Sequence, residues 1–280
     1  MNRNLKAPLV DIAVLAALAV LVLAAAVGLS PGTSAQGKNG FALSISPNAC
    51  GQAKIPLGAA GKFTVLAGTT VTNTGPTVVH GNLGLSPGSA VTGFPPGKVT
   101  GKIDRADPAA AKAQTALVAA YTNGMGRTNC RVAVAGNIGG ETLGPGLYHS
   151  SSSLAISSGD LTLTAHGHSG AVFIFQVTSK LTVTSGRHVI LAGGALASNI
   201  YWVVGSSATL GTTAVVYGDI LAHKSISMAT GATLHGMALA HIGAVTFAAN
   251  TVTAVPLTTS PAAMTASILA PASIIARFSP

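Results

Sequence analysis

Between residues 181 and 253, apolar and polar positions alternate in a pattern that repeats itself. Residues 208–222 align with residues 226–240 without a gap, 18 residues later. A repeat of about 18 to 27 residues, rich in β-branched residues and with Gly near each corner, is typical of one coil of a β-solenoid. The pattern therefore predicts stacked coils of short strands over this part of the chain.

An apolar–hydroxyl–apolar triplet marks the repeats. Successive side chains of a strand point to opposite sides, so the outer residues of each triplet are expected in the core and the middle one in solvent. Five stacked triplets would form a row of outward hydroxyls: Thr162, Thr182, Thr209, Ser227 and Thr246.

The periodicity changes once, to that of a helix. Asp107 is a typical N-cap residue and Pro108 suits the first helical position, so a helix is predicted over residues 108–123, with Gly124 ending it. One face of this helix is apolar: Ala113, Leu117, Ala120 and Tyr121. We expect it to lie along the side of the solenoid and to cover part of it.

Composition narrows the possible functions. Only 8% of the residues are charged, and 34 residues are glycine. This composition suits a tightly packed solenoid. The net charge is +9, but the basic residues are scattered, so nucleic-acid binding is not expected. A carboxylate-dependent β-helix enzyme is also not expected, because few acids follow residue 35: Asp104, Asp107, Glu141, Asp160 and Asp219.

Histidines are more frequent than acids and raise the possibility of a metal site. The candidates are the pair His166 and His168 and the near-periodic set His223, His235 and His241. Metal sites need convergent ligands, often supported by carboxylates, which are scarce here. We therefore expect no metal and no cofactor.

The ends of the chain indicate export. A basic start, an apolar run over residues 12–29 and a small-x-small site at residues 33–35 predict a signal peptide over residues 1–35. The alternative is an uncleaved anchor, since 18 apolar residues can just span a bilayer. Residues 36–56 resemble a linker, 57–254 a single β domain and 255–280 a Pro-containing flexible tail without a membrane span. The expected product is a secreted or cell-surface monomer, free of the membrane once the signal is removed.

The chain has two cysteines, Cys50 and Cys130, and both lie after the predicted signal. A single pair in an oxidising compartment favours one disulfide, with two free thiols as the alternative.

Several motifs, taken in order, resemble the microbial ice-binding protein family. In the N-terminal half they are residues 63–77 (FTVLAGTTVTNTGPT), 81–88 (GNLGLSPG) and 91–97 (VTGFPPG). In the C-terminal half they are residues 171–176 (AVFIFQ), 204–211 (VGSSATLG) and 230–233 (TGAT). The resemblance implies a discontinuous right-handed three-faced β-solenoid with one long α-helix alongside. It also implies adsorption to ice without a cofactor.

The family commonly contacts ice through one flat face that carries Thr-Ala/Gly-x-Thr/Asn repeats. Here the resemblance places that motif at residues 185–188, 212–215, 230–233 and 249–252, and only the third copy is intact. It implies four ice-contacting residues on one face, namely Thr212, Thr230, Thr233 and Thr251. Val189, Val216, Leu234 and Val252 would lie inward behind them, while His188, Val215 and Tyr217 would interrupt the array.

Two alternatives remain open at this level. The triplet row is a second candidate for the ice-contacting face. A cell-surface adhesion or structural module with a degenerate ice face is the alternative function, and an array broken by His188 and Tyr217 would favour it.

Overall fold

A computed structural model of the protein describes residues 50–254. The predicted signal peptide (1–35), most of the predicted linker (36–56) and the predicted tail (255–280) lie outside the described residues. Within them, no helix is both long and apolar enough to cross a bilayer.

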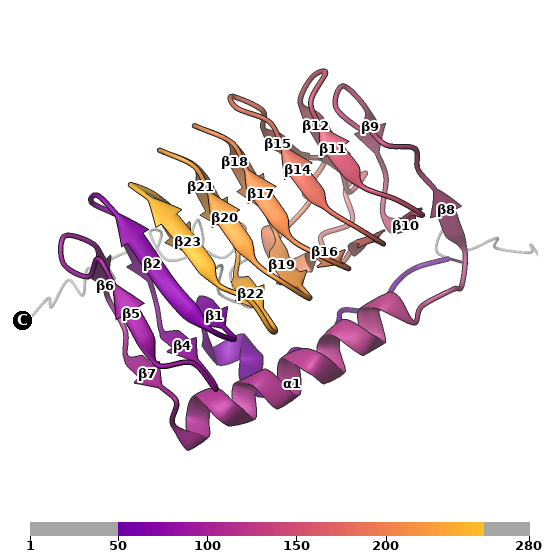
Figure 1. Cartoon of the computed structure of the whole chain (residues 1–280). Helices are drawn as coiled ribbons and strands as arrows, with labels where there is room; N and C mark the ends of the chain where they lie inside the picture. Colours follow the sequence, from indigo (N-terminus) through magenta and orange to yellow (C-terminus); the bar gives the residue numbers. More distant parts are fainter. Residues whose placement is uncertain (1–49, 255–280) are drawn as a thin grey trace, which may run out of the picture. The chain divides into compact units, whose positions relative to one another are not determined.

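The described chain is a β-solenoid whose short strands pair in parallel from coil to coil, as the repeat predicts (Figure 1). The first sheet has, in spatial order, β7 (Ile103–Arg105), β4 (Leu83–Leu85), β1 (Val65–Ala67), β22 (Ala238–Ala240), β19 (Asp219–Ala222), β16 (Ile200–Val204), β13 (Phe173–Val177), β10 (Gly146–Ser150) and β8 (Arg131–Ala133). The second sheet has β11 (Leu154–Ile156), β14 (Leu181–Val183), β17 (Ala208–Leu210), β20 (Ile226–Met228), β23 (Val245–Ala248), β2 (Thr70–Thr74) and β5 (Ala90–Thr92).

Two smaller sheets make up the third face. One contains β15 (Val189–Ala192), β12 (Leu161–Thr164) and β9 (Thr142–Leu143). The other contains β18 (Val215–Tyr217), β21 (Thr233–His235), β24 (Thr251–Thr253), β3 (Val78–His80) and β6 (Lys98–Val99). A single bridge between His188 and Val215 joins them.

The solenoid is discontinuous, as the family resemblance implied. The last coil in the sequence pairs with the first, since Val65 lies opposite Ala238 in the first sheet and Thr72 opposite Thr246 in the second. Figure 1 shows the indigo strands β1 and β2 directly beside β22 and β23 at the other end of the colour scale. Residues about 170 positions apart therefore share one surface.

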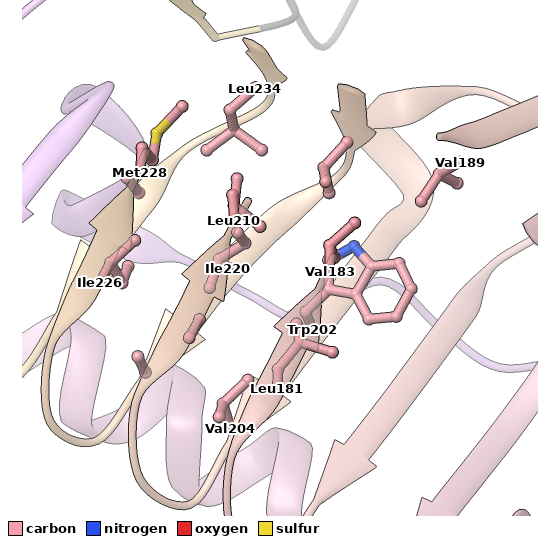
Figure 2. Close-up of a cluster of buried hydrophobic side chains, with 14 of the residues drawn as sticks. Leu181, Val183, Val189, Trp202, Val204, Leu210, Ile220, Ile226, Met228 and Leu234 are labelled. Atoms are coloured by element: carbon pink, nitrogen blue, oxygen red, sulfur yellow. The ribbon is translucent and has the colours of Figure 1, made fainter. Parts of the chain in front are cut away.

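Inward side chains of successive coils form a continuous apolar core. Trp202 stacks on Phe175 with ring centroids 4.2 Å apart, and Phe175 stacks on Tyr148 at 5.1 Å. Figure 2 shows Trp202 among aliphatic side chains from neighbouring coils, including Leu181 and Val183. This packing makes the stack of coils rigid, which matters for any surface built on it.

The helix α1 (Pro108–Met125) runs along the first sheet from β7 to β8 (Figure 1). Asp107 caps it as predicted, because its Oδ1 accepts a hydrogen bond of 2.7 Å from the Ala110 N–H. The buried face of α1, with Leu117 at its centre, packs against outward side chains of the first sheet: Leu147, Ile174, Val203, Leu221 and Leu239. The two 3₁₀ turns, η1 (Gly58–Lys62) and η2 (Ala197–Asn199), complete the helical content described.

The predicted role of Gly124 is wrong, because the helix continues to Met125 and Gly126 caps it. Gly124 is buried inside the last turn, where an added Cβ would lie 2.8 Å from Val203 Cγ2 and 2.9 Å from Ile55 Cδ1. Its lack of a side chain thus allows α1 to approach the sheet closely.

Residues 50–56, which the sequence assigned to a linker, instead pack against the helix. Ile55 is buried between α1 and the first sheet, and the Arg127 guanidinium donates hydrogen bonds to the carbonyls of Ala53 and Lys54. Cys50 is bonded to Cys130, with a Cα–Cα distance of 5.6 Å, so the expected disulfide is present. The disulfide fixes this segment at the end of the helix, beside β8.

The C-terminal end of α1 is held by a side chain from the sheet, which leads to a first prediction. Gln176 Nε2 lies 2.8 Å from the Gly124 carbonyl oxygen, 3.2 Å from that of Met125 and 2.8 Å from that of Arg127. Gln176→Met should lower the free energy of unfolding by about 2–3 kcal/mol, because buried carbonyl groups lose their donor. Urea denaturation monitored by circular dichroism measures this.

The matched control is Gln114→Met. Gln114 and Gln176 are both buried, and the Oε1 of each has no partner among the described residues, but Gln114 Nε2 donates only to the Ala240 carbonyl, at 3.2 Å. The control should cost about 1 kcal/mol. Equal losses in the two variants would contradict the capping role of Gln176.

Candidate functional site

Only two faces of the solenoid can present a broad surface. The helix α1 lies along the first sheet and buries its outward side chains, so that sheet cannot act as a contact surface. The second sheet and the third face carry no covering element among residues 50–254, and they differ strongly in the side chains that they present.

The second sheet presents a row of hydroxyl groups that we call the threonine ladder. The register places one outward residue of each strand opposite that of the next: Thr182, Thr209, Ser227, Thr246, Thr72 and Thr92. Ala155 extends the row beyond Thr182. Five of the six ladder residues are exposed and Thr182 is half-buried. Neighbouring strands lie about 4.8 Å apart, so the ladder repeats its hydroxyl and methyl groups at that interval.

The surface around the ladder is flat and uncharged. Within the strands of the second sheet, no outward side chain is larger than threonine, and none of the seven strands contains a charged residue. The apolar partners in each triplet point inward and are buried, as Leu181 and Val183 show beside Thr182. Threonine is β-branched and stiff about χ1, so the methyl and hydroxyl positions are well defined.

A second row of hydroxyls, which we call the corner row, borders the ladder where the chain turns toward the third face. It consists of Ser185, Thr212, Thr230 and Thr74, all exposed, with Ala248 between the last two. Backbone hydrogen bonds connect these turns from one coil to the next. For example, the Gly186 N–H donates to the Thr212 carbonyl at 2.8 Å, and the Thr213 N–H donates to the Thr230 carbonyl at 3.0 Å.

The residue after each member of the corner row has a positive φ angle. These residues are Gly186, Thr213, Gly231, Ala249 and Gly75, with φ between 52° and 82°. The Ala/Gly position of the family motif thus coincides with a left-handed turn, a conformation that favours glycine. The motif marks the corner of the coil.

The structure separates the four threonines that the resemblance placed on one face. Thr212 and Thr230 belong to the corner row, whereas Thr233 and Thr251 pair with each other on the third face and are half-buried. The expectation of a single face is therefore wrong, because each motif spans a corner. The inward positions were predicted correctly: Val189, Val216, Leu234 and Val252 are all buried.

Two further expectations need correction. Thr162 is not part of the ladder, because it pairs with Thr142 and Ile190 on the third face, and Ala155 occupies its place in the second sheet. The fourth motif was also aligned one residue too late. Thr251 lies opposite Thr233, so the stacked segment is 248–251 and not 249–252.

The third face is uneven by comparison. One of its rows combines Ile190, Tyr217, His235, Thr253 and His80. Tyr217 and His235 stack with ring centroids 4.7 Å apart, and partial burial lowers the pKa of His235 below its ordinary value. The bulky residues that were expected to interrupt the array, His188, Val215 and Tyr217, all belong to this face and leave the ladder unbroken.

Sequence reasoning missed two members of the ladder, Thr72 and Thr92. A signal was present for Thr72, since residues 70–74 alternate as a strand should. What could not be seen was that β2 lies beside β23.

Among residues 50–254, no three His, Cys, Asp or Glu side chains lie close enough together to hold a metal ion. His223 and His241 lie together, with ring centroids 5.5 Å apart, beside Tyr121. Burial, followed by the neighbouring His223, lowers the pKa of His241. These groups lie near α1 and not among the residues of the ladder.

Comparison with known proteins identifies relatives across this whole region. The sequence profile of the ice-binding-like family matches residues 65–253. An ice-binding protein of Nostoc sp. (strain HG1) is 44% identical over 197 residues, which cover 70% of this chain and 72% of that protein. One of Flavobacterium frigoris (strain PS1) is 39% identical over 214 residues, or 71% and 76% of the two chains.

Solved structures give the same result for the fold. The crystal structure of an ice-binding protein from an Antarctic biological consortium superposes with a TM-score of 0.72 at 51% identity, covering 72% of this chain and 92% of that one. An ice-binding protein from the Antarctic ascomycete Antarctomyces psychrotrophicus gives 0.70 at 36% identity, covering 73% and 100%.

Proposed function

Because this chain belongs to the ice-binding-like family, we propose that it adsorbs to ice through its second sheet, with the threonine ladder and the corner row as the contact surface. The observation that carries the choice of face is the register of the strands. It places six hydroxyl residues in one unbroken row on a sheet without a large or charged outward side chain.

The physical basis is a regular array on a rigid support. Threonine methyl groups restrict the adjacent water, while the hydroxyl groups hydrogen-bond to it, so a layer of water matched to the face can merge with the crystal. Each water-mediated bond contributes little alone. The packed core and the stacked coils leave little entropy to be lost on adsorption, so that many weak contacts add.

The third face supports adsorption less well. The outward side chains there differ in size, from Thr253 to Tyr217 and His235, so this face lacks the uniform threonine and serine surface of the second sheet. The neighbouring row of the third face contains Thr233 and Thr251, which lie between Val215 and Val78. These two threonines form only a two-residue array.

Ice as the partner also accounts for the composition of the surface. An uncharged face needs no ion pair, and the ladder lies within one chain, so adsorption requires no second copy. No catalytic group is needed for adsorption. Export through the predicted signal over residues 1–35 would place the protein where ice forms. The relatives named above favour ice binding over the adhesion alternative.

Two activity measurements on the full chain test the proposal. Thermal hysteresis and uptake of fluorescently labelled protein into a growing ice hemisphere should both be positive. The variant Thr233→Tyr, on the third face, should retain wild-type activity in both assays, because it leaves the ladder untouched. Absence of uptake by the wild type would contradict ice binding, and loss of activity in Thr233→Tyr would move the contact to the third face.

A further inference from the structure

Asn250 is a buried polar residue at the corner between the second sheet and the third face. In the register of the coils, the residues at the same place in the two preceding coils are Ala214 and Ala232, and both are buried. An amide at a position that alanine fills elsewhere needs a physical reason, because burying a polar group is unfavourable unless it is hydrogen-bonded.

The side chain of Asn250 connects two successive corners. Its Nδ2 donates to the Ala229 carbonyl at 2.7 Å and to the Ala232 carbonyl at 3.0 Å, both in the preceding coil. Its Oδ1 accepts a hydrogen bond from the Ala248 N–H in its own coil. Ala229 and Ala232 stand on either side of Thr230 in the sequence, and Ala248 is the next member of the corner row. One amide group therefore joins the backbone around Thr230 to that of its neighbour in the row.

The backbone of Asn250 connects the same corner to a third coil. Its N–H donates to the buried Thr77 hydroxyl at 2.9 Å, and its carbonyl accepts a bond of 2.8 Å from the Val78 N–H. In the preceding coil the equivalent N–H closes the turn within its own coil, since the Ala232 N–H donates to the Ala229 carbonyl at 3.1 Å. The Asn250 N–H instead reaches across the junction at which the last coil of the sequence meets the first.

We propose, on the basis of the function proposed above for the second sheet, that Asn250 is a positioning residue that keeps the corner row in register across this junction. Two backbone bonds carry the row over it. The Gly231 N–H donates to the Ala248 carbonyl at 3.1 Å, and the Ala249 N–H donates to the Thr74 carbonyl at 2.8 Å. Without the Asn250 amide, the turn that carries Ala248 can shift relative to its two neighbours in the row.

The threonine ladder does not depend on these contacts. Its members Ser227 and Thr246 lie opposite each other in paired strands, and Thr246 lies opposite Thr72 in the next pair. Removing the Asn250 side chain should therefore loosen the corner row and leave the ladder in place. A loosened row has to be ordered again when it meets the crystal, which lowers the affinity for ice.

The variant Asn250→Ala, made in the full chain, tests the proposal by amide hydrogen exchange and by ice uptake. The Gly231 and Ala249 amides should exchange about tenfold faster than in the wild type, because the turn that they hold opens more often. Uptake of the labelled protein into a growing ice hemisphere should fall about threefold, since only part of the contact surface is disturbed. The Ile220 N–H donates to the Met237 carbonyl at 2.8 Å in the first sheet and should stay protected, which shows that the coils remain folded.

The matched control is Asn199→Ala. Asn199 is also a buried asparagine that bonds to another coil, since its Nδ2 donates to the Ser169 carbonyl at 2.9 Å, but it directly precedes β16 of the first sheet. This variant should leave the corner amides and ice uptake as in the wild type. A second variant, Thr77→Val, removes the acceptor of the Asn250 N–H without a change of volume. It should also accelerate exchange at Ala249 and lower uptake, and it provides the same test if Asn250→Ala does not fold.

The outcomes separate this inference from the proposed function. Absence of ice uptake by the wild type would overturn both. Uptake by the wild type together with unchanged corner exchange or unchanged uptake in the Asn250 and Thr77 variants would overturn the role of Asn250 alone. An equal fall of uptake in Asn199→Ala would also overturn it, because the loss would then follow from lower stability and not from the corner row.

Discussion

Replacing Thr209 by tyrosine is expected to remove most of the ice activity while the protein stays folded. Thr209 is the exposed second residue of the threonine ladder, between Thr182 and Ser227. A tyrosine ring there would stand above a surface on which no other outward side chain exceeds threonine, and it would hold the crystal away from the neighbouring rows. We expect the affinity for ice to fall about tenfold or more, which corresponds to a loss of about 1.4 kcal/mol or more of adsorption free energy, and thermal hysteresis to fall with it.

The substitution is on the solvent side of the sheet, so the free energy of unfolding should change by only about 0.5 kcal/mol. Thermal hysteresis and ice uptake would be compared with those of Thr233→Tyr at equal folding, checked by circular dichroism. Both variants place a tyrosine on a strand of the solenoid, but on different faces. Equal loss in the two, or a larger loss in Thr233→Tyr, would contradict the assignment of the second sheet.

Much of the fold could be predicted because its signals are local. The overlay of residues 208–222 on 226–240 reappears as strand pairs offset by 18 residues, such as Thr209 with Ser227. The helix was marked by Asp107 and Pro108, whose roles depend only on the adjacent backbone. Gly124 failed as a predicted terminator, because its reason for being glycine is a contact with Val203 on a distant strand.

The assignment of strands to faces could not be predicted with the same success. Leu154-Ala-Ile156 and Leu161-Thr-Leu163 occur in one coil and have the same burial pattern, yet they lie in different sheets. The triplet pattern predicts a half-buried strand. It does not predict where the chain turns before that strand, and this turn decides the sheet to which the strand belongs. Coil lengths also vary, since Thr182 and Thr209 are 27 residues apart in sequence whereas Thr209 and Ser227 are 18 apart.

The remaining part of the site depends on long-range topology. Thr72 extends the ladder because β2 pairs with β23, a contact between the two ends of the solenoid domain. No periodicity within residues 181–253 specifies that contact. The resemblance to a known family implied such an arrangement, but residue-level register came only from the structure.

Between pH 4 and pH 8, the variant Asp219→Asn should gain stability relative to the wild type by about 4 kcal/mol. Asp219 begins β19 and is buried, and its Oδ1 accepts one hydrogen bond, of 3.0 Å, from the Met237 N–H. Burial raises the pKa of this carboxyl from 3.8 to about 7, with the Met237 N–H and then Lys54 opposing the shift.

The sign follows from proton binding. From about pH 4 to pH 7 the folded protein holds a proton on Asp219 that the unfolded chain has released. Wild-type stability therefore falls by about 1.4 kcal/mol per pH unit from this group, and the fall ends above the folded-state pKa. Asparagine cannot ionise, so the stability of the variant does not fall with pH for this reason.

The control is Tyr201→Phe, which lies opposite Asp219 in the sheet. Burial and the nearby Asp219 raise the pKa of Tyr201, so its hydroxyl stays neutral over the whole range, while Arg127 acts in the opposite direction. Removing that hydroxyl should change stability by a constant amount and leave its slope with pH as in the wild type. Urea denaturation at several pH values gives both slopes. A difference between Asp219→Asn and wild type that does not change with pH would mean that the buried carboxyl ionises in the folded protein as freely as in the unfolded chain.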